Sequence, residues 1–478
     1  MKNFSLLGIL LLFLSSMTAQ EKQWTLEECV NYALENNISV KQAELDVDLS
    51  EIEKRDAIGN FIPGVNAQAT NSWNTGLTQD VTTGILVNQT VRNFSAGVTA
   101  GLTIFDGLRN FKQLQRARIS RLASEYSLEK MKDDIALFVA DAYLQVLFNK
   151  QNLEVLRAQN LVTQEQLERT NELVEAGVLP QGDLLEIKAT FADEQQRMIV
   201  AENQIEISLI SLAQTLAIQD YENFDIVERD YDVFGGEILQ YSAREIIERA
   251  KEEREEIRIA ETNMELAQKD VELARGAYLP SFGAFFNYNT RESGRGRIVG
   301  AEIDPDQPFR QIGVVQETEQ LVVAPNTIPT VGEPLPFFDQ LSMNDGFSYG
   351  FQLSIPILNG FATRNQVRRS EVGVLRAEYQ LEQAELDLEA NVYQAFTDAK
   401  GAFKAYEAAI VALEAQEKAF EYATERYDVG LTNAFDFSQA KLRFENAQRE
   451  MLRTKYDYIF KLKVVELYFG IPVAELKF

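Results

Sequence analysis

The sequence contains no histidine and only one cysteine, Cys29. Histidine is the commonest general base and the commonest transition-metal ligand in proteins, so its absence removes the usual catalytic and metal-binding side chain. A single cysteine can form neither an internal disulfide nor a CxxC site, and Cys29 lies in a helical pattern that predicts a small core residue. No pair of carboxylates stands out from the many surface acids. We therefore expect no enzyme activity and no catalytic, cofactor or metal site.

Positive charge is also scarce. The chain has 46 basic and 73 acidic residues, and its net charge is −27. A protein that binds nucleic acid would present a basic face, so this balance argues against a nucleic-acid partner.

Long apolar runs are missing except at the N-terminus. Residues 1–19 read as a secretory signal peptide, with Lys2 followed by an apolar run to Leu14 and by small or polar residues to Ala19. The run is too short to span a membrane as a helix. Because Cys29 comes too late to be a lipidated first residue, we expect an exported protein that is not a lipoprotein and does not cross a bilayer as helices.

The sequence contains an internal duplication at an offset of 253 residues. The stretch AGVLPQGDLLEIKATF, which begins at Ala176, resembles VGLTNAFDFSQAKLRF, which begins at Val429. Four apolar residues spaced by seven follow in each copy. They are Phe191, Met198, Ile205 and Leu212 in the first, and Phe444, Met451, Tyr458 and Val465 in the second. The chain therefore consists of two similar halves.

The seven-residue spacing predicts long helical hairpins packed as coiled coils. In each half the longer helix would measure roughly 100 Å at 1.5 Å per residue. Gly177 and Gly430 interrupt the pattern, and glycine is the residue that most readily takes the positive φ that ends a helix. We therefore predict that these two glycines are the hairpin turns.

Four segments change to a two-residue period, with apolar or aromatic residues on one face and small or polar residues on the other. Alternation of this kind fits transmembrane barrel strands, although a single such strand would more often belong to a soluble sandwich. Four strands cannot close around a water-filled pore, and lipid does not tolerate open sheet edges, so three copies supplying twelve strands are expected. The segments are GVNAQATNSW, FSAGVTAGLTI, SFGAFFNYN and FSYGFQLSI.

The insertion at 291–346 holds six of the eleven prolines and is expected to be an extended extracellular loop with little regular structure. Its RESGRGR stretch fits a solvated turn better than a site for lipopolysaccharide phosphates. The expected organisation is a signal peptide (1–19), a helical segment (20–62), a β-hairpin (63–106), a helical hairpin (107–217), a linker (218–243), a helical segment (244–279), a second β-hairpin (280–359), a second helical hairpin (360–469) and a tail (470–478).

This combination of two helical hairpins, two barrel hairpins and a signal peptide resembles the TolC-like outer-membrane efflux factor family over the whole mature chain. The resemblance implies a mainly α fold with a membrane β-barrel portion: a homotrimer with a twelve-stranded barrel and a long α-helical barrel. It also implies a location in the outer membrane of a Gram-negative bacterium, extending into the periplasm. The implied function is a passive exit duct that works with a periplasmic adaptor and an inner-membrane transporter of the RND or ABC type.

The resemblance also implies roles for residues at the hairpin turns. The family's VGL-type motif, which seats the adaptor, matches Gly430, Leu431 and Thr432 well and Gly177, Val178 and Leu179 more loosely. Tyr427, Asp436 and Asp183 match positions that narrow the periplasmic aperture. Thr432 stands where the family has arginine, and Gln439 stands at a second aspartate position. For Asp436 and Asp183, helix N-capping is an equally good interpretation.

Three alternatives are open at this point. The first is a channel for ABC-driven type I protein secretion, which differs from drug efflux only in its transporter. The second is a periplasmic coiled-coil adaptor, which would have helical hairpins but neither the paired strands nor the duplication. The third, a hydrolase on a helical scaffold, finds no support, because there is no nucleophile motif and no histidine.

Overall fold

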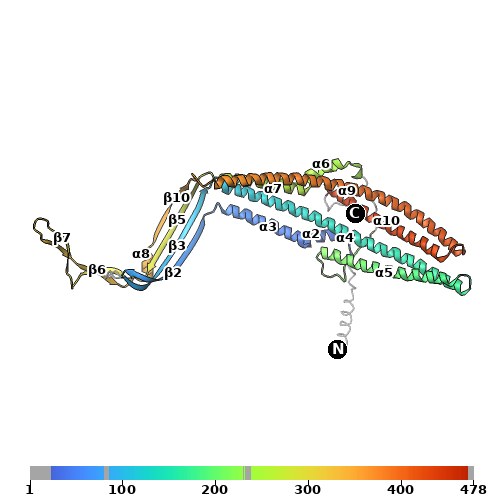
Figure 1. Cartoon of the computed structure of the whole chain (residues 1–478), viewed down its shortest axis with the longest axis horizontal. Coiled ribbons are helices and arrows are strands. Elements are labelled where there is room, and N and C mark those ends of the chain that lie inside the picture. Colours follow the sequence, from blue (N-terminus) through green and yellow to red (C-terminus); the bar gives the residue numbers. More distant parts are fainter. Residues whose placement is uncertain (1–22, 80–85, 230, 232–237, 472–478) are drawn as a thin grey trace, which may run out of the picture. The chain divides into compact units, whose positions relative to one another are not determined.

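The computed structural model describes residues 23–79, 86–229, 231 and 238–471 (Figure 1). The predicted signal peptide, residues 1–19, lies outside these ranges, as do residues 472–478 of the predicted tail. None of the helices within the described ranges has both the length and the apolarity to span a membrane. The chain forms two compact units, one mainly helical and one built around a β-sheet.

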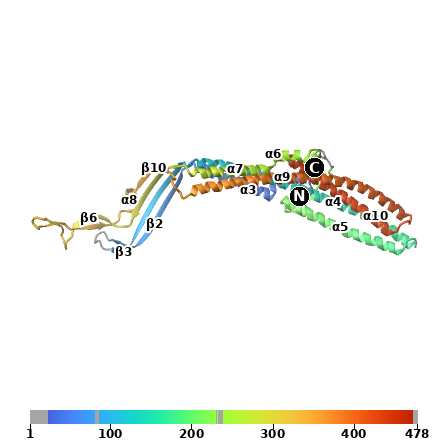
Figure 2. The same cartoon turned by 45° about the horizontal axis from the view of Figure 1, so that its top comes forward.

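The helical unit contains two long antiparallel hairpins (Figures 1 and 2). The first pairs α4 (Arg109–Glu175) with α5 (Gln181–Thr215), and the second pairs α9 (Ala362–Asp428) with α10 (Ala434–Tyr468). The turns contain Gly177 and Gly430, as the sequence predicted.

Corresponding helices of the two halves have equal lengths. The pairs α4 and α9 have 67 residues each, and α5 and α10 have 35 each. The shorter helices α3 (Ile38–Gly59) and α7 (Glu255–Gly276) have 22 each, and α2 (Leu26–Asn36) and α6 (Ala243–Glu253) have 11 each. Both of the 11-residue helices begin with a capping box, built by Thr25 and Glu28 in α2 and by Ser242 and Glu245 in α6. Equal lengths and repeated caps are what a duplicated chain would produce.

The largest core cluster of the helical unit surrounds a small two-stranded sheet. In it β1 (Gln23–Trp24) pairs in parallel with β4 (Asp225–Ile226), which lies in the segment that connects the two halves. The Tyr143 hydroxyl donates to the carbonyl of Val227 at 2.9 Å and fixes this segment to α4. Cys29 is fully buried in the same cluster, as predicted for a core residue.

The other unit contains one antiparallel sheet of four strands, in the order β10–β5–β3–β2 (Figure 1). The four segments that the two-residue period identified form these strands. They are β2 (Gly64–Gln79), β3 (Leu86–Phe105), β5 (Ser281–Ser293) and β10 (Gly346–Ser354).

The strand register separates apolar from polar side chains. Val98, Tyr288 and Phe347 are directly paired across β3, β5 and β10, so they share one face. The next row contains Thr99, Asn287 and Ser348 and lies on the opposite face. The apolar face is open, since Phe347, Tyr349 and Phe351 of β10 are 68–76% exposed. A sheet with an exposed aromatic face and a polar reverse matches the alternation of a membrane barrel wall.

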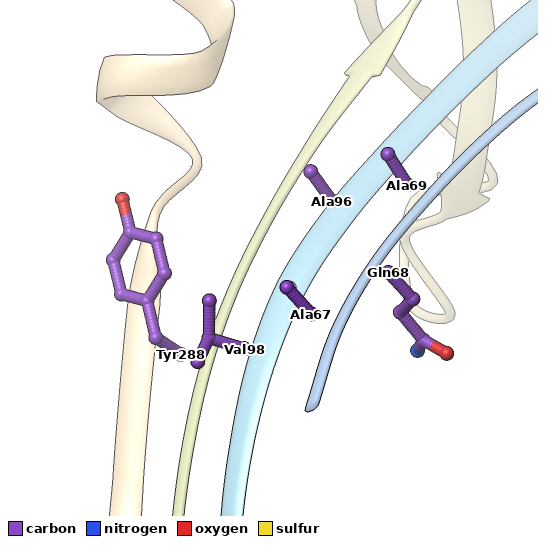
Figure 3. Close-up of a pocket in the computed structure, with 7 residues that line it drawn as sticks. Ala67, Gln68, Ala69, Ala96, Val98 and Tyr288 are labelled. Atoms are coloured by element: carbon purple, nitrogen blue, oxygen red, sulfur yellow. The ribbon is translucent and has the colours of Figure 1, made fainter. Parts of the chain in front are cut away.

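Alanines make one part of the apolar face shallow. A depression of about 380 Å³ is lined by Ala67, Ala69 and Ala96 beside Val98 and Tyr288 (Figure 3). The side chain of Gln68, the remaining labelled residue, points away from this group (Figure 3). The small side chains explain why β2 has the weakest alternation of the four strands in the sequence.

The expectation of an irregular insertion at 291–346 was wrong. This segment forms a two-stranded ribbon, in which β6 (Arg297–Ile303) pairs with β9 (Thr327–Gly332) and β7 (Phe309–Val314) pairs with β8 (Leu321–Pro325), followed by the short helix α8 (Phe337–Met343). The prolines that suggested a loop are compatible with this ribbon, because a strand with a free edge tolerates a residue that lacks the amide hydrogen. Pro325, for example, is the last residue of β8.

Candidate functional site

The two hairpin turns have the same backbone geometry. Gly177 and Gly430 take φ values of +71° and +73°, which residues with a Cβ rarely adopt. In each turn an amide just beyond the glycine donates back across the helix end, which is the hydrogen-bond pattern of a Schellman motif. These bonds run from Val178 to the carbonyl of Leu173 at 2.9 Å, and from Leu431 to the carbonyl of Arg426 at 2.8 Å.

The first turn exposes one large aliphatic side chain, Val178, and the second exposes two, Leu431 and Val429, of which Val429 is 69% exposed. Val178 is 67% exposed and Leu431 is 70% exposed, whereas Leu179 and Thr432 are half-buried. A Cβ atom at Gly177 or Gly430 would meet no other atom within 4 Å, so only the backbone conformation restricts these positions. Each turn therefore presents exposed apolar surface beside a glycine with positive φ.

The interpretation of Asp436 and Asp183 as N-caps was wrong. The N-cap of α10 is Asn433, whose side chain accepts a hydrogen bond from the amide of Asp436 at 2.9 Å. The N-cap of α5 is Pro180, which has no side-chain acceptor. Both aspartates lie three residues further on, in the first helical turn, where a carboxylate interacts favourably with the helix dipole.

The Asp436 carboxylate accepts a hydrogen bond from the Thr432 hydroxyl at 3.2 Å, so the structure brings these two predicted residues together. Asp436 is exposed and Asp183 is half-buried. Among the described residues the structure records no hydrogen bond between the two aspartates. The two turns therefore carry carboxylates that are separate and partly or fully open to water.

Tyr427 is packed inside the helical unit. It is only 5% exposed, its ring stacks on Phe437 at a centroid distance of 5.1 Å, and its hydroxyl lies 3.1 Å from that of Thr170. Thr170 belongs to α4 and Tyr427 to α9, so this contact joins the two hairpins close to their turns. Arg169 of α4 forms an ion pair with Asp428 of α9 at 2.9 Å in the same region.

Thr170, Arg169 and Asp428 were missed from the sequence. Thr432 stands where the resemblance implies an arginine, yet an arginine reaches the same end of the hairpins from α4. Nothing in the local sequence indicates this, because the two ion-pair partners lie in different halves of the chain and meet only through hairpin packing.

The comparisons with known proteins agree with this architecture. The model of the outer membrane efflux protein family matches residues 29–217 and 246–463, most of the chain. The chain belongs to the outer membrane efflux protein family.

Individual relatives of this efflux protein are distant. The outer membrane protein TolC of Vibrio cholerae is 26% identical over 340 residues, which cover 70% of this chain and 66%, just under two thirds, of that protein. The proteases secretion protein PrtF of Dickeya chrysanthemi is 22% identical, and the match covers 89% of this chain and 84% of that protein. The solved CmeC outer membrane channel of Campylobacter jejuni has the same fold, with a TM-score of 0.72, 17% identity, and coverage of 93% of this chain and 85% of that one.

The efflux protein also buries an ion pair between its two hairpins. Lys441 of α10 and Glu194 of α5 are each 2% exposed, and the ammonium lies 2.5 Å from the carboxylate. The Lys441 ammonium also donates to the carbonyl of Gln159 at 2.5 Å and to the Thr163 hydroxyl, both on α4. Thr163 and Asn160 donate to Glu194 at 3.0 and 3.3 Å. Helices of both hairpins therefore converge on one buried polar cluster.

A second buried acid lies one turn along α10. Glu445 is 1% exposed and pairs with Arg197 of α5 at 2.5 Å. Burial raises the pKa of the Glu445 carboxyl, and Arg197 opposes that effect. Burial likewise lowers the pKa of the Lys441 ammonium, against the opposing influence of Glu194.

A signal for this cluster is present in the sequence. Glu194 lies on the seven-residue series Ile187, Glu194, Ala201 and Ser208, all buried in the structure. The coiled-coil prediction rested on the neighbouring series through Phe191 and Met198, so a charge at a core position was overlooked. Among the described residues no group of three or more acidic or cysteine side chains is arranged to hold a metal ion.

We predict that Glu194→Ala strongly destabilises the helical unit, because it leaves a buried ammonium without its counter-ion. Breaking one side of a buried pair typically costs about 3–5 kcal/mol, whereas replacing both partners by apolar residues is often neutral. The double variant Glu194→Leu, Lys441→Met is the matched control. The measurement is loss of the helical circular-dichroism signal on heating; equal midpoints for the two variants would contradict the prediction.

Proposed function

We propose that three copies of this chain form a passive exit duct in the outer membrane. The duct receives substrates from an inner-membrane transporter of the RND or ABC type and conducts them across the periplasm to the exterior. A periplasmic adaptor connects the transporter to the hairpin turns. The chain reaches the outer membrane as an exported protein that starts with a cleaved signal peptide and carries no lipid.

The four-stranded sheet is the observation that carries this proposal. Its outer strands, β10 and β2, each have one edge that pairs with no other strand of the described chain. Its apolar face is rich in exposed aromatic side chains, as a lipid-facing wall requires. Because lipid offers no hydrogen-bonding partner, these edges have to pair with other copies, and three copies close a barrel of twelve strands.

Two exposed apolar stripes on the helical unit support the same assembly. On α9, Val372, Tyr379, Leu386 and Tyr393 are spaced by seven and are 46–70% exposed. On α3, Ile38, Leu45 and Ile52 are spaced by seven and are 53–65% exposed. A seven-residue apolar stripe is the signature of a coiled-coil seam, so α3 of one copy and α9 of the next supply the two sides of a seam.

Protein secretion is the second candidate function. PrtF, whose name describes the secretion of proteases, matches 89% of the chain, and a type I secretion channel would use the same duct with an ABC transporter. The transporter that co-purifies with the native trimer discriminates between the two. A periplasmic adaptor function is less well supported, because it does not explain the sheet.

We predict that Gly430→Trp abolishes export while the protein remains trimeric and in the outer membrane. The indole would fill the space beside Leu431, where a Cβ atom at position 430 would have no neighbour within 4 Å. Gly430→Ala is the control, because it strains the backbone at φ +73° by roughly 1–2 kcal/mol without adding bulk, and it should retain export. Substrate accumulation in cells is the measurement, and normal export by Gly430→Trp would mean that the adaptor docks elsewhere.

We predict that Asp436 gives the channel a preference for cations. In a trimer this exposed carboxylate occurs three times around the narrow end, and a ring of carboxylates attracts cations. Asp436→Asn should therefore shift the reversal potential under a salt gradient in planar bilayers. Asn433→Ala, which removes the N-cap, should leave the reversal potential unchanged and lower stability by about 0.5–2 kcal/mol. Coinciding reversal potentials for wild type and Asp436→Asn would contradict a role for Asp436 in selectivity.

A further inference from the structure

The short helix α8 is fixed onto the apolar face of the sheet. The Thr290 hydroxyl donates to the carbonyl of Leu341 at 2.6 Å. The Gln340 amide forms two hydrogen bonds with the backbone of Ser293, accepting from its nitrogen and donating to its oxygen, both at 3.1 Å. Thr290 shares its face with Tyr288, two residues earlier on β5. The helix therefore occupies a fixed place on the side of the sheet that the proposed barrel turns toward lipid.

Aromatic rings connect α8 to this face. The Phe337 ring lies 5.1 Å from that of Phe94, a residue of the apolar face, and 5.3 Å from that of Phe338. Phe338 is 79% exposed, one of the most exposed large apolar side chains of the described chain. Trp73 of β2 is 63% exposed and pairs with Arg92, two residues before Phe94 on β3.

The helix α8 lies at one end of the part of the apolar face that carries no charged residue, which we call the uncharged band. Arg92, two residues before Phe94 on β3, forms an ion pair at 2.7 Å with Glu292, the β5 residue directly paired with Phe94, and Glu292 is buried. From Phe94 to Ile104 the apolar-face residues of β3 carry no charge. Ten residue steps measure about 33 Å along a strand, or about 25 Å along the normal for a strand tilted by about 40°, which is the height of the apolar band of outer-membrane barrels.

We propose that α8 is an interfacial anchor that binds the outer-leaflet lipid at the boundary between acyl chains and headgroups. This inference rests on the proposed barrel. Phe337 and Phe338 extend the aromatic girdle that such barrels carry at this level, although they come from a connection and not from a strand. The exposed carboxylate of Asp339 on the same helix stays in water. By holding Phe338 at the boundary, α8 sets the depth of the sheet in the membrane.

Quenching of tryptophan fluorescence by brominated lipid tests the proposal. Phe338→Trp is made with Trp73→Phe, so that Trp24 of the helical unit remains as a constant background. The trimer is reconstituted in vesicles of phosphatidylcholine brominated either near the headgroup or near the chain end. Two reference variants use the same background: Tyr349→Trp, whose row contains Phe286 and Ala100 near the middle of the uncharged band, and Phe309→Trp, on the ribbon.

We expect brominated lipid to quench most of the fluorescence that the tryptophan at position 338 adds to that of Trp24. Quenching should be stronger with bromine near the headgroup than with bromine near the chain end. The Tyr349→Trp variant should show the opposite depth preference, and Phe309→Trp should not be quenched. If position 349 is quenched and position 338 is not, the proposed barrel is supported and the proposed anchor is wrong. If neither position is quenched, the sheet is not in lipid, and the proposed function fails together with the anchor.

Discussion

The hydrogen-bonding groups on the free edges of β2 and β10 set the main constraint on this molecule. A four-stranded sheet with an exposed aromatic face is unsuited to water, and its edges are unsuited to lipid. In the proposed assembly, pairing between copies satisfies the edges, and the closed sheet can then place its aromatic face in lipid. The same requirement makes sense of the helical unit, where apolar stripes on α3 and α9 are exposed in the single chain.

The two helical hairpins end in similar turns. Both have a Schellman turn at a glycine with positive φ, so the two turns share the same backbone geometry. The contacts that join the hairpins differ in kind along their length. Near the turns these are the Tyr427–Thr170 hydrogen bond and an exposed ion pair between Arg169 and Asp428, and further along the Lys441–Glu194 pair is buried. Exposed pairs are weak and buried pairs are costly to break, so losing one partner of the Lys441–Glu194 pair costs more free energy than losing one partner of the Arg169–Asp428 pair.

The features that could be predicted from the sequence are those that follow from a regular spacing of apolar residues. Seven-residue spacing identified the long helices, alternation identified all four strands of the sheet, and the two glycines marked the turns. Prediction from the sequence failed where a signal was local and ambiguous: prolines in 291–346 suggested a loop, but a ribbon with free edges accommodates them. It also offered capping as one of two equally good interpretations of Asp436, although Asn433 is the cap. The contacts of Thr170 and Arg169 depend on how the hairpins pack, which no local pattern encodes.

The number of copies that close the sheet is the most direct test of this account. Variants with one cysteine in β2 and one in β10 suit this test, because the single natural cysteine, Cys29, is buried. The account predicts that oxidation in membranes yields species of one, two and three cross-linked chains on a denaturing gel, and nothing larger. A ladder that continues beyond three, or the absence of any β2–β10 cross-link across a full set of positions, would contradict it.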